Sequence, residues 1–586
     1  MEEFANVLIS VILLGVLSQV RSHAFNHKYE KGDPVPLYTN KVGPFHNPSE
    51  TYAYYSLPFC PPDHWEEKKE TLGEMLNGDR LVSAPYKLDF RVDKESQVCR
   101  KNFSREEVSQ FRTVIAQDYY LQMYYDDLPV WAFIGKIDKN SPNEDRYFIF
   151  RVLQFDVFYN GDRVIEINLR TNPTFVNDLT EDKVIDMEFL YSVKWKETFT
   201  PFEERTLKYL QSSILPHHMS IHRFAMSNSI WTTLILACCL VALYVRVLRK
   251  DFNNYSDDEE LAGNQEETGW KIIHGDVFRY PKHKSFFVAA IGCGTQLFTV
   301  VLSIIILGTM GVFRPYDRGV LRTALVITYA VTNAISGFCA VSFYHQLEGS
   351  NWVKNLALAG FLFCGPLFLT FCFLNAVAAT YGSTAALPLG TIGVIFLIWL
   401  FLAFPLLLLG GFVGKIIKSE FQAPCRTTQC PREIPALRWY RGVLPQMVFA
   451  GLLPFGVIYT ELYYIFATVW GHRVYTLYGV LFICFILLIT ITAFVSIGFT
   501  YLQLAAEDHL WWWRSFLCGG STGIYVYAYC FYYYFLRSDM SGFMQASFFF
   551  GYMACICYGL FLLLGTVGFR ASLLFVRYIY SSIKCE

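Results

Sequence analysis

Charged residues are scarce in this sequence of 586 residues, where Asp, Glu, Lys and Arg together make up 17%. No block of Lys or Arg forms a stripe that could follow a phosphate backbone, which argues against a nucleic-acid-binding protein. Neither a Walker loop nor an H-E-x-x-H zinc motif occurs. No internal repeat typical of transporters is evident. We therefore expect a protein that is not an enzyme, with no catalytic residues, no metal site, no cofactor and no nucleic-acid partner.

Cysteine is rare in the first part of the chain, although the whole sequence contains sixteen. Only Cys60 and Cys99 precede residue 226, and an oxidising compartment would favour their pairing. We predict a Cys60–Cys99 disulfide, with two buried thiols as the alternative. Cys425 and Cys430 lack a second pair at zinc spacing, so we expect them to be structural.

Apolar residues, in contrast, are abundant and unevenly distributed. They make up 53% of the chain, aromatics contribute 17%, and the mean hydropathy is +0.29. Each of nine apolar segments is long enough to cross about 30 Å of hydrocarbon as a helix. They are approximately 226–248, 286–310, 321–343, 356–380, 389–413, 443–469, 477–504, 515–536 and 543–569. The first is a separate transmembrane helix, and 286–569 holds eight more.

The N-terminus resembles a secretory signal peptide, predicted to cover residues 1–24. Val7 to Leu17 is an apolar run too short to span a bilayer comfortably, and Ser22-His23-Ala24 offers small residues for cleavage. Glu2 and Glu3 stand where basic residues are usual, so a retained anchor is the alternative. A cleaved signal would place the following domain in the lumen.

The charges of the connecting loops predict the same orientation. With residues 25–225 in the lumen, the cytosolic connections hold 18 Lys or Arg residues, counting Arg246 at the end of the first span, and the connections on the other side hold five. The cytosolic parts would be the loop 249–285, three shorter connections and the tail 570–586. Within the first loop, the acidic stretch from Ser256 to Thr268 is expected to be a flexible linker.

Residues 25–225 are expected to form a β-rich lumenal domain, most plausibly a sandwich. Residues 147–158, 163–169 and 189–195 alternate as half-buried strands do, and Asn160-Gly161 predicts a hairpin turn. Ser104 and Glu107 form a capping box before a helical pattern of apolar residues. The fold class is thus a bundle of nine transmembrane helices with a β-rich N-terminal domain.

Two sequons occur in the chain. Asn102-Phe103-Ser104 lies in the predicted lumenal domain and is a candidate N-glycosylation site, although Ser104 is also the predicted helix cap. Asn254-Tyr255-Ser256 lies on the predicted cytosolic side, where it would not be used.

Polar and small residues inside the apolar segments are candidate functional positions. Glu461 is the one carboxylate well inside a span, so it is either part of an ion path or cargo contact, or a structural hydrogen-bonding group, with a tyrosine such as Tyr459. The four-residue glycine spacings 410/414 and 519/523 allow close helix approach. We expect them to pack the protein's own helices, with recognition of a cargo helix as the alternative.

An aromatic and acidic cluster precedes the eighth segment. Glu507, Asp508 and His509 are successive residues and cannot all face one metal ion in a regular element. Residues 511–513 are three tryptophans, which we interpret as an interfacial belt, with Arg514 as a head-group anchor.

Several blocks of residues, spread over nearly the whole chain, resemble the nonaspanins, the transmembrane 9 superfamily. They are Tyr38-Thr39-Asn40-Lys41-Val42-Gly43-Pro44, Asn47, Glu50-Thr51-Tyr52, Leu57-Pro58-Phe59-Cys60, Asp126-Asp127-Leu128-Pro129, Trp131, Tyr191-Ser192-Val193-Lys194-Trp195, Gly269-Trp270-Lys271, His274-Gly275-Asp276-Val277-Phe278-Arg279, Pro424-Cys425-Arg426, Glu461-Leu462-Tyr463-Tyr464-Ile465-Phe466, Glu507-Asp508 and Trp511-Trp512-Trp513. The resemblance implies nine spans, a Golgi or endosomal membrane location, and sorting of other membrane proteins, including cargo with glycine-rich transmembrane helices. It implies no catalytic residues.

The last three residues, Lys584-Cys585-Glu586, match the C-terminal lysine–any–acidic retrieval signal of that family. The resemblance implies that Lys584 and Glu586 bind the coatomer coat. Our hypothesis is therefore a non-enzymatic sorting protein whose partners are membrane lipid, coatomer and cargo membrane proteins. The alternative is a transporter, channel or lipid-moving protein that uses the helical bundle.

Overall fold

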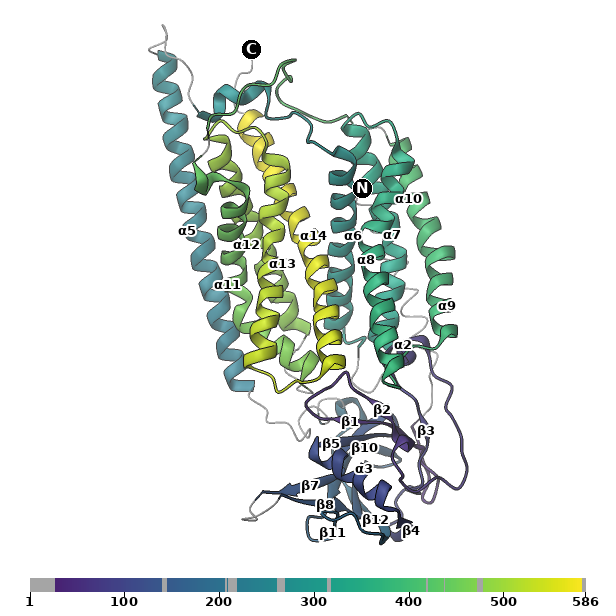
Figure 1. Cartoon of the computed structure of the whole chain (residues 1–586). Coiled ribbons are helices and arrows are strands. Elements are labelled where there is room, and N and C mark those ends of the chain that lie inside the picture. The colour runs from purple at the N-terminus through teal and green to yellow at the C-terminus, as the bar shows by residue number, and fades with distance from the viewer. Residues whose placement is uncertain are drawn as a thin grey trace.

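The computed structural model describes residues 27–139, 145–205, 208, 219–260, 269–313, 318–417, 420–436, 438–471 and 478–581. The chain folds into two parts, a β-rich domain formed by residues 27–205 and a bundle of long helices that stands on it (Figure 1). We call the end of the bundle that faces this domain the domain end. The opposite end, where α14 finishes at Ser581, is called the far end.

The first sheet of the domain has five antiparallel strands in the order β2-β1-β5-β6, with β3 also paired to β1. Its strands are β1 (Leu37–Pro44), β2 (Tyr52–Ala53), β3 (Val82–Ser83), β5 (Tyr119–Tyr125) and β6 (Leu128–Phe133). Every residue of β5 is buried, as expected for a central strand covered on both faces.

The second sheet has the order β10-β9-β12-β4, in which β12 runs parallel to β9 and the other pairs are antiparallel. Its strands are β4 (Lys94–Phe103), β9 (Val152–Asn160), β10 (Arg163–Thr171) and β12 (Ile185–Glu197). A smaller sheet has the order β11-β8-β7. It consists of β7 (Gly135–Asp138), β8 (Arg146–Phe150) and β11 (Val176–Asp178).

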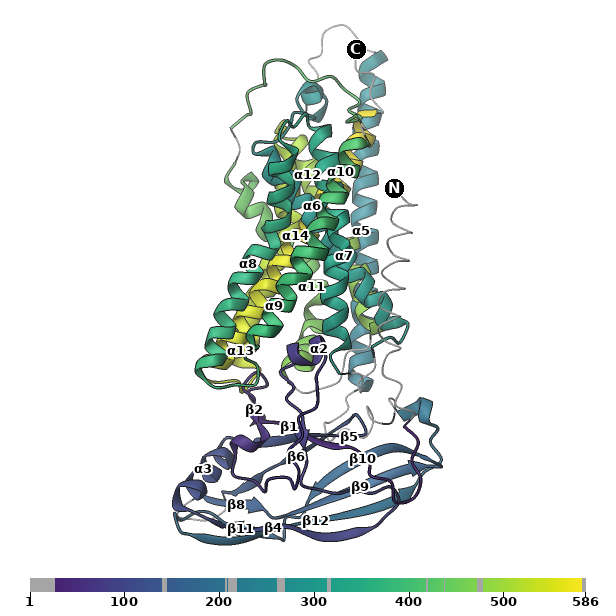
Figure 2. The same ribbon diagram turned by 90° about the vertical axis from the view of Figure 1, so that its right-hand side faces the viewer.

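The two larger sheets share one apolar core, in the manner of a sandwich (Figure 2). Met123 and Val130 of the first sheet and Phe155 and Val193 of the second are at most 2% exposed. Helix α3 (Arg105–Ala116) adds Phe111 to this core. The predicted β-rich, sandwich-like domain is therefore what the chain forms.

The local predictions for this domain hold with one shift. Ser104 caps α3, its Oγ accepting from the Glu107 amide at 3.3 Å while Glu107 Oε2 accepts from the Ser104 amide at 2.9 Å. In the β9–β10 hairpin Asn160 pairs with Arg163, so the turn is Gly161-Asp162, one residue later than predicted. Gly161 has φ +62°, a conformation that favours glycine.

The bundle contains nine long helices in the part of the chain that the structure describes. They are α5 (Met219–Glu260), α6 (Lys284–Thr309), α7 (Val320–Gln346), α8 (Trp352–Thr380), α9 to α10 (Leu389–Ile398 and Phe404–Ile416, joined by a π-helical turn), α11 (Val443–Trp470), α12 (Tyr478–Leu504), α13 (Trp511–Leu536) and α14 (Phe543–Ser581). Eight are long and apolar enough to cross a membrane; the exception is α13, which corresponds to the eighth predicted segment, 515–536. It contains six tyrosines and three glycines, which lower its hydropathy although it packs among the other helices.

Small residues form two tight seams between the helices. A Cβ added to Gly410 or Gly414 of α10 would overlap or crowd the backbone of α7. A Cβ added to Gly519 or Gly523 of α13 would do the same to α14. Both predicted glycine pairs therefore pack the protein's own helices and leave no room there for a cargo helix.

Two helices are longer than their apolar segments. α5 continues to Glu260, so the first part of the stretch predicted as a flexible linker is helical, while residues 261–268 lie outside the described chain. α14 continues past Phe569 to Ser581, through most of the predicted tail 570–586. The extension of α14 has its own packing, because Val576, Ile579 and Tyr580 are fully buried and Tyr580 Oη donates to the Trp270 carbonyl at 2.6 Å.

Candidate functional site

The junction between the β-rich domain and the bundle begins with a short helix, α2 (Leu72–Leu76), which lies against α7 (Figure 2). Thr71 caps α2, and its amide donates to Glu74 Oε2 at 2.8 Å. Gly73 and Gly319 touch backbone to backbone, since a Cβ on either residue would overlap the other's main chain. Gly319 also has φ +73°, so two separate demands favour glycine there.

Arg318 connects the two parts electrostatically. Its Nη2 lies 3.1 Å from Glu74 Oε1, and the two side chains are only 4% and 11% exposed. The guanidinium also lies over the Tyr124 ring, 4.5 Å from its centroid. One turn further along α7, Arg322 donates to Asn77 Oδ1. Two arginines of the bundle thus contact polar groups of the domain.

Behind these contacts the domain holds a buried polar network. Asn40 Nδ2 donates to Asp79 Oδ1 at 2.9 Å and to Gln122 Oε1 at 3.1 Å, and Lys41 Nζ lies 3.5 Å from Asp79 Oδ1. Burial lowers the pKa of the Lys41 ammonium. Burial opposes ionisation of Asp79, but Lys41 and the amides of Asn77 and Asn40 outweigh it and hold the pKa of this carboxyl below its ordinary value. The network fixes the strand β1 beneath α2.

A second contact joins the loop before β2 to the bundle. Thr51 and Thr384, which precedes α9, bond through their backbones at 2.9 Å and their hydroxyls at 2.7 Å. Asn47 Oδ1 accepts from the Ser541 amide at 3.0 Å, and the Ser49 amide donates to Gln545 Oε1 at 2.9 Å. The domain therefore bonds to the starts of α7, α9 and α14 and is held in one orientation.

Glu70 is the group at the junction whose ionisation is most perturbed toward neutral pH. Its Oε1 accepts from the Leu81 amide at 2.7 Å, and Arg80 Nη1 lies 3.7 Å from its Oε2. Arg80 in turn donates to the Ala386 carbonyl of the bundle at 3.1 Å. Burial raises the pKa of Glu70 to about 7, although the Leu81 amide and Arg80 lower it.

We expect Glu70→Gln to remove a pH dependence of stability. The ordinary Glu pKa is 4.5, so the penalty for burying the ionised carboxylate is absent below pH 4.5, grows as pH rises, and is complete above pH 7. Between pH 4.5 and 7, the free energy of unfolding of the wild-type domain should fall by on the order of 1 kcal/mol relative to that of Glu70→Gln, after allowance for partial exposure. Unfolding of the full chain in detergent at several pH values measures the difference. Glu95→Gln, at an exposed position of β4, is the control and should track wild type; a constant difference for Glu70→Gln would contradict the assignment.

At the far end of the bundle, the connections are closed by a compact cap. Asp276 accepts from Arg279 Nε at 3.1 Å, from Thr428 Oγ1 at 3.0 Å and from the Arg432 amide at 3.1 Å. Trp511 Nε1 donates to the Val277 carbonyl at 2.8 Å. Two loops far apart in sequence are therefore bound to the start of α13.

The interpretation of the tryptophans as an interfacial belt is wrong for two of the three. Trp511 and Trp512 are 0% and 2% exposed and stack in the core beside Phe569. Arg514, predicted as a head-group anchor, lies 2.9 Å from Asp508 and is 15% exposed. Hydropathy alone cannot separate a tryptophan at the lipid surface from one buried beneath a cap. Among the described residues, no group of His, Cys, Asp or Glu is arranged to hold a metal ion.

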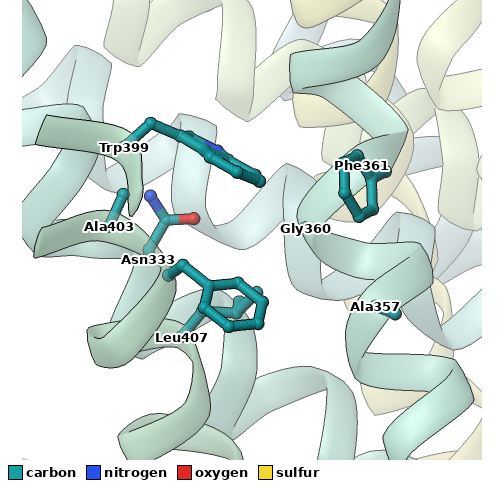
Figure 3. Close-up of a pocket in the computed structure, with 8 residues that line it drawn as sticks. Asn333, Ala357, Gly360, Phe361, Trp399, Ala403 and Leu407 are labelled. Atoms are coloured by element: carbon teal, nitrogen blue, oxygen red, sulfur yellow. The ribbon is translucent and has the colours of Figure 1, made fainter. Parts of the chain in front are cut away.

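A different kind of site occurs in the membrane-facing part of the bundle. The π-helical turn Trp399–Ala403 lies between α9 and α10, and such turns are frequent at functional positions. It borders a small pocket together with Asn333 of α7 and Gly360 and Phe361 of α8. Figure 3 shows the Asn333 amide below the Trp399 ring and across the pocket from Gly360. Asn333 Nδ2 donates to the Tyr329 carbonyl at 3.0 Å, which orients the amide.

Comparison with known proteins identifies the family. The model of the family described as Endomembrane protein 70 matches residues 51–543. Transmembrane 9 superfamily member 2 of Arabidopsis thaliana is 64% identical over 99% of both chains. The chain belongs to the transmembrane 9 superfamily. Transmembrane 9 superfamily member 1 of Mus musculus is 39% identical over 99% of this chain and 97% of its own. A protein of Dictyostelium discoideum named putative phagocytic receptor 1b is 41% identical over 99% of both. No solved structure matches.

In this multi-pass membrane protein, the blocks that resemble the transmembrane 9 superfamily lie mainly at the domain end and the far end of the helical bundle. Asn40, Lys41, Asn47 and Thr51 build the junction, and Asp276 belongs to the cap. The sequence identified these residues by resemblance but assigned them no place. It missed α2 and the role of Arg318, which entered only the count of loop charges.

The other predicted sites of this transmembrane 9 protein lie apart from one another. Cys60 and Cys99 form a disulfide with Cα atoms 6.0 Å apart, and the Asn102 side chain is exposed at the end of β4. Glu461 is 2% exposed on α11, and Cys484 of α12 lies close enough to interact with it electrostatically. Tyr459, the predicted partner, is 44% exposed and packs against Phe455 and Tyr529. Lys584 and Glu586 lie outside the described residues.

Proposed function

We propose that this transmembrane 9 protein sorts or retains other membrane proteins in Golgi and endosomal membranes without catalysing a reaction. The β-rich domain would lie in the lumen and the far end in the cytosol. Family membership and the asymmetry of the loop charges support this arrangement. The printed name of the Dictyostelium relative, a putative phagocytic receptor, is compatible with a role at membranes that exchange with the cell surface.

The observation that carries the proposal is a lipid-facing surface on α8 and α9 to α10. In an apolar stretch of 18 residues of each of these spans, only 11% of the residues are buried, against 56% in the corresponding stretches of α6 and α7. The pocket that contains Asn333 and Trp399 lies between these helices. Asn333 lies behind this surface, 4% exposed, with its Nδ2 bonded to the Tyr329 carbonyl of its own helix, so the surface offers a second helix mainly the exposed side chains of α8 and α9.

The same surface favours a partner helix with small residues. A Cβ added to Gly365 of α8, or to Gly390 or Gly393 of α9, would meet nothing within 4 Å. These glycines therefore leave space open, whereas the glycine seams of α10 and α13 are filled by neighbouring helices. Two helices with small residues approach closely and gain backbone packing. We infer that the cargo is a membrane protein with a glycine-rich transmembrane helix.

The transport alternative has less support. Among the eight apolar segments predicted between residues 286 and 569, Glu461 is the only carboxylate. Ile458, Leu462 and Phe466 around it belong to the apolar core. Glu461 does not line the pocket at Asn333.

The letters Gly519-Gly520-Ser521-Thr522-Gly523 match the G-x-S-x-G pattern of hydrolases, but their setting differs. That pattern requires a sharp turn between a strand and a helix, which exposes the serine. Here the residues lie within α13, and Ser521 Oγ donates to the Cys518 carbonyl at 2.7 Å. We infer that Ser521 packs α13 and does not act as a nucleophile.

The experiment follows two single-span reporters in cells that lack the protein and are complemented with wild type or a variant. One reporter has a glycine-rich transmembrane helix, and in the other the glycines are leucine. Asn333→Leu and Trp399→Ala should redistribute the glycine-rich reporter alone. Leu574→Ala changes an exposed position of α14 outside the pocket and should act as wild type. Equal behaviour of both reporters in all lines would contradict the proposal.

We further propose that coatomer binds the C-terminal residues Lys584 and Glu586. α14 continues to Ser581, and Lys584 and Glu586 lie outside the described residues. Replacing both residues with alanine, or adding residues after Glu586, should weaken coat binding and shift the protein forward from the Golgi. If all variants keep their Golgi location, the membrane spans retain the protein instead.

The glycan at Asn102 is expected to report orientation. If the β-rich domain is lumenal, Asn102→Gln should abolish the mobility shift produced by glycosidase, since Asn102 is exposed. Asn254→Gln should leave the shift unchanged, because its sequon would lie in the cytosol. A shift that persists in Asn102→Gln and disappears in Asn254→Gln would reverse the proposed topology.

A further inference from the structure

Helix α5 is the most loosely attached helix of the bundle. In an apolar stretch of 18 residues of α5, only 6% of the residues are buried. The helix lies at the edge of the bundle beside α11 and α12 (Figure 1). A single side-chain hydrogen bond is described between α5 and its neighbours, from Tyr244 Oη to the Phe494 carbonyl of α12 at 2.6 Å. The Tyr244 hydroxyl rests on Gly498, where a Cβ would overlap it.

Beside this bond, an apolar cavity of about 320 Å³ separates α5 from α11, α12 and α14. Leu240, Leu243 and Val247 line it on α5, and Val495 and Leu502 line it on α12. Phe575 of α14 places the cavity in the half of the membrane nearer the far end. Polar atoms contribute almost nothing to the lining, so water would gain no hydrogen bonds there.

The size of the cavity restricts its occupant. A helix with side chains is about 10 Å across, so about 320 Å³ would hold less than one helical turn of about 5.4 Å. A hydrocarbon chain, which is narrow and flexible, matches both the apolar lining and the position within the membrane. The cavity is therefore suited to a lipid tail and not to a cargo helix.

One cation stands where the head group of such a lipid would be. Arg246 is exposed on α5 one turn beyond Leu243 toward the far end, on the same side of the helix as that residue of the cavity lining. Arg249 is also exposed, but at about 100° per residue it lies on the opposite side of α5 from the lining residues. Lipid tails exchange for other lipid tails at little gain, so a preference must come from the head group and the fit.

We propose that this cavity binds one acyl chain of an anionic glycerophospholipid from the far-end leaflet, with the phosphate head group at Arg246. The bound lipid fills the space between α5 and the bundle and joins α5 to α12. It is independent of the surface on α8 and α9 that was proposed for cargo, since the two sites share no residue.

The test uses the full chain reconstituted into phosphatidylcholine nanodiscs that contain spin-labelled phosphatidylserine or, in parallel, spin-labelled phosphatidylcholine. Wild type should immobilise labelled phosphatidylserine about tenfold more strongly, which corresponds to about 1.4 kcal/mol. Arg246→Gln should abolish that preference, whereas Arg249→Gln, on the opposite side of α5, should keep it. Leu243→Trp, which narrows the cavity, should release both labels.

Leu574→Trp, at an exposed position of α14 outside the cavity, is the control and should behave as wild type. Each variant is first checked for unchanged thermal unfolding. If Leu243→Trp retains the preference, Arg246 attracts lipid only at the surface and the cavity assignment is overturned. Equal immobilisation of the two labels by wild type would overturn the proposal entirely.

Discussion

Replacing Arg318 with alanine is expected to release the β-rich domain from the bundle at a cost of about 3–5 kcal/mol, the range for removing one partner of a buried ion pair. Arg318 and Glu74 are 4% and 11% exposed, and their charged atoms lie 3.1 Å apart. Removing the guanidinium leaves a carboxylate with its surroundings largely closed to water. It also removes the cation above the Tyr124 ring.

Hydrogen exchange of the amides in residues 72–79 measures this opening directly. A loss of about 3–5 kcal/mol increases the exchange rate by a factor of about 100 to 1000 or more. The double variant Arg318→Ala with Glu74→Ala should lose less free energy of docking than the sum of the losses in the two single variants, because the two side chains share one interaction. Lys87→Ala breaks the exposed pair with Asp63 and should leave exchange at the junction unchanged. Additive losses would show that the pair does not hold the junction.

The second large effect is expected from Gly319→Ala. A side chain there meets both the unfavourable φ of +73° and the backbone of Gly73 and Glu74. The backbone conformation costs about 1–3 kcal/mol and the crowding about as much again, so we expect a total of about 2–6 kcal/mol. α2 should move away from α7, and exchange at residues 72–79 should become faster.

Gly311 provides a matched control in the same connection between α6 and α7. Its φ is +76°, yet an added Cβ would meet nothing within 4 Å. Gly311→Ala therefore carries the conformational cost without the clash. Equal effects of Gly311→Ala and Gly319→Ala would show that the close contact of α2 with α7 contributes nothing to docking.

Features governed by local sequence could be predicted well. The capping box at Ser104 fixed the start of α3, and the apolar segments gave the nine helices because spanning hydrocarbon requires a minimum length. Even the two glycine pairs were assigned to internal packing. α13 shows the limit of hydropathy, since its tyrosines and glycines suit contacts with other helices better than contact with lipid.

Features that depend on distant contacts could not be predicted. Trp511 is buried because the cap of residues 276–279 and 428–432 covers it, and that cap exists only after two loops meet. α14 continues beyond its apolar segment, where Tyr580 donates a hydrogen bond to the Trp270 carbonyl. Pro405, which follows the π-helical turn at Trp399, signals an interrupted helix but not a π-helical turn, so the pocket beside Asn333 became visible only in three dimensions.

The most direct test of the proposed function is site-specific photo-crosslinking from the surface of α8. Phe361 lines the pocket and is 54% exposed, so a photoreactive residue there would face a bound helix. Leu574 of α14 is 68% exposed and lies outside that pocket. In intact membranes, we expect adducts between position 361 and the glycine-rich reporter and few adducts with its leucine counterpart. Asn333→Leu should lose the adducts with the glycine-rich reporter. Equal yields from positions 361 and 574, or from both reporters, would contradict recognition of cargo at this surface.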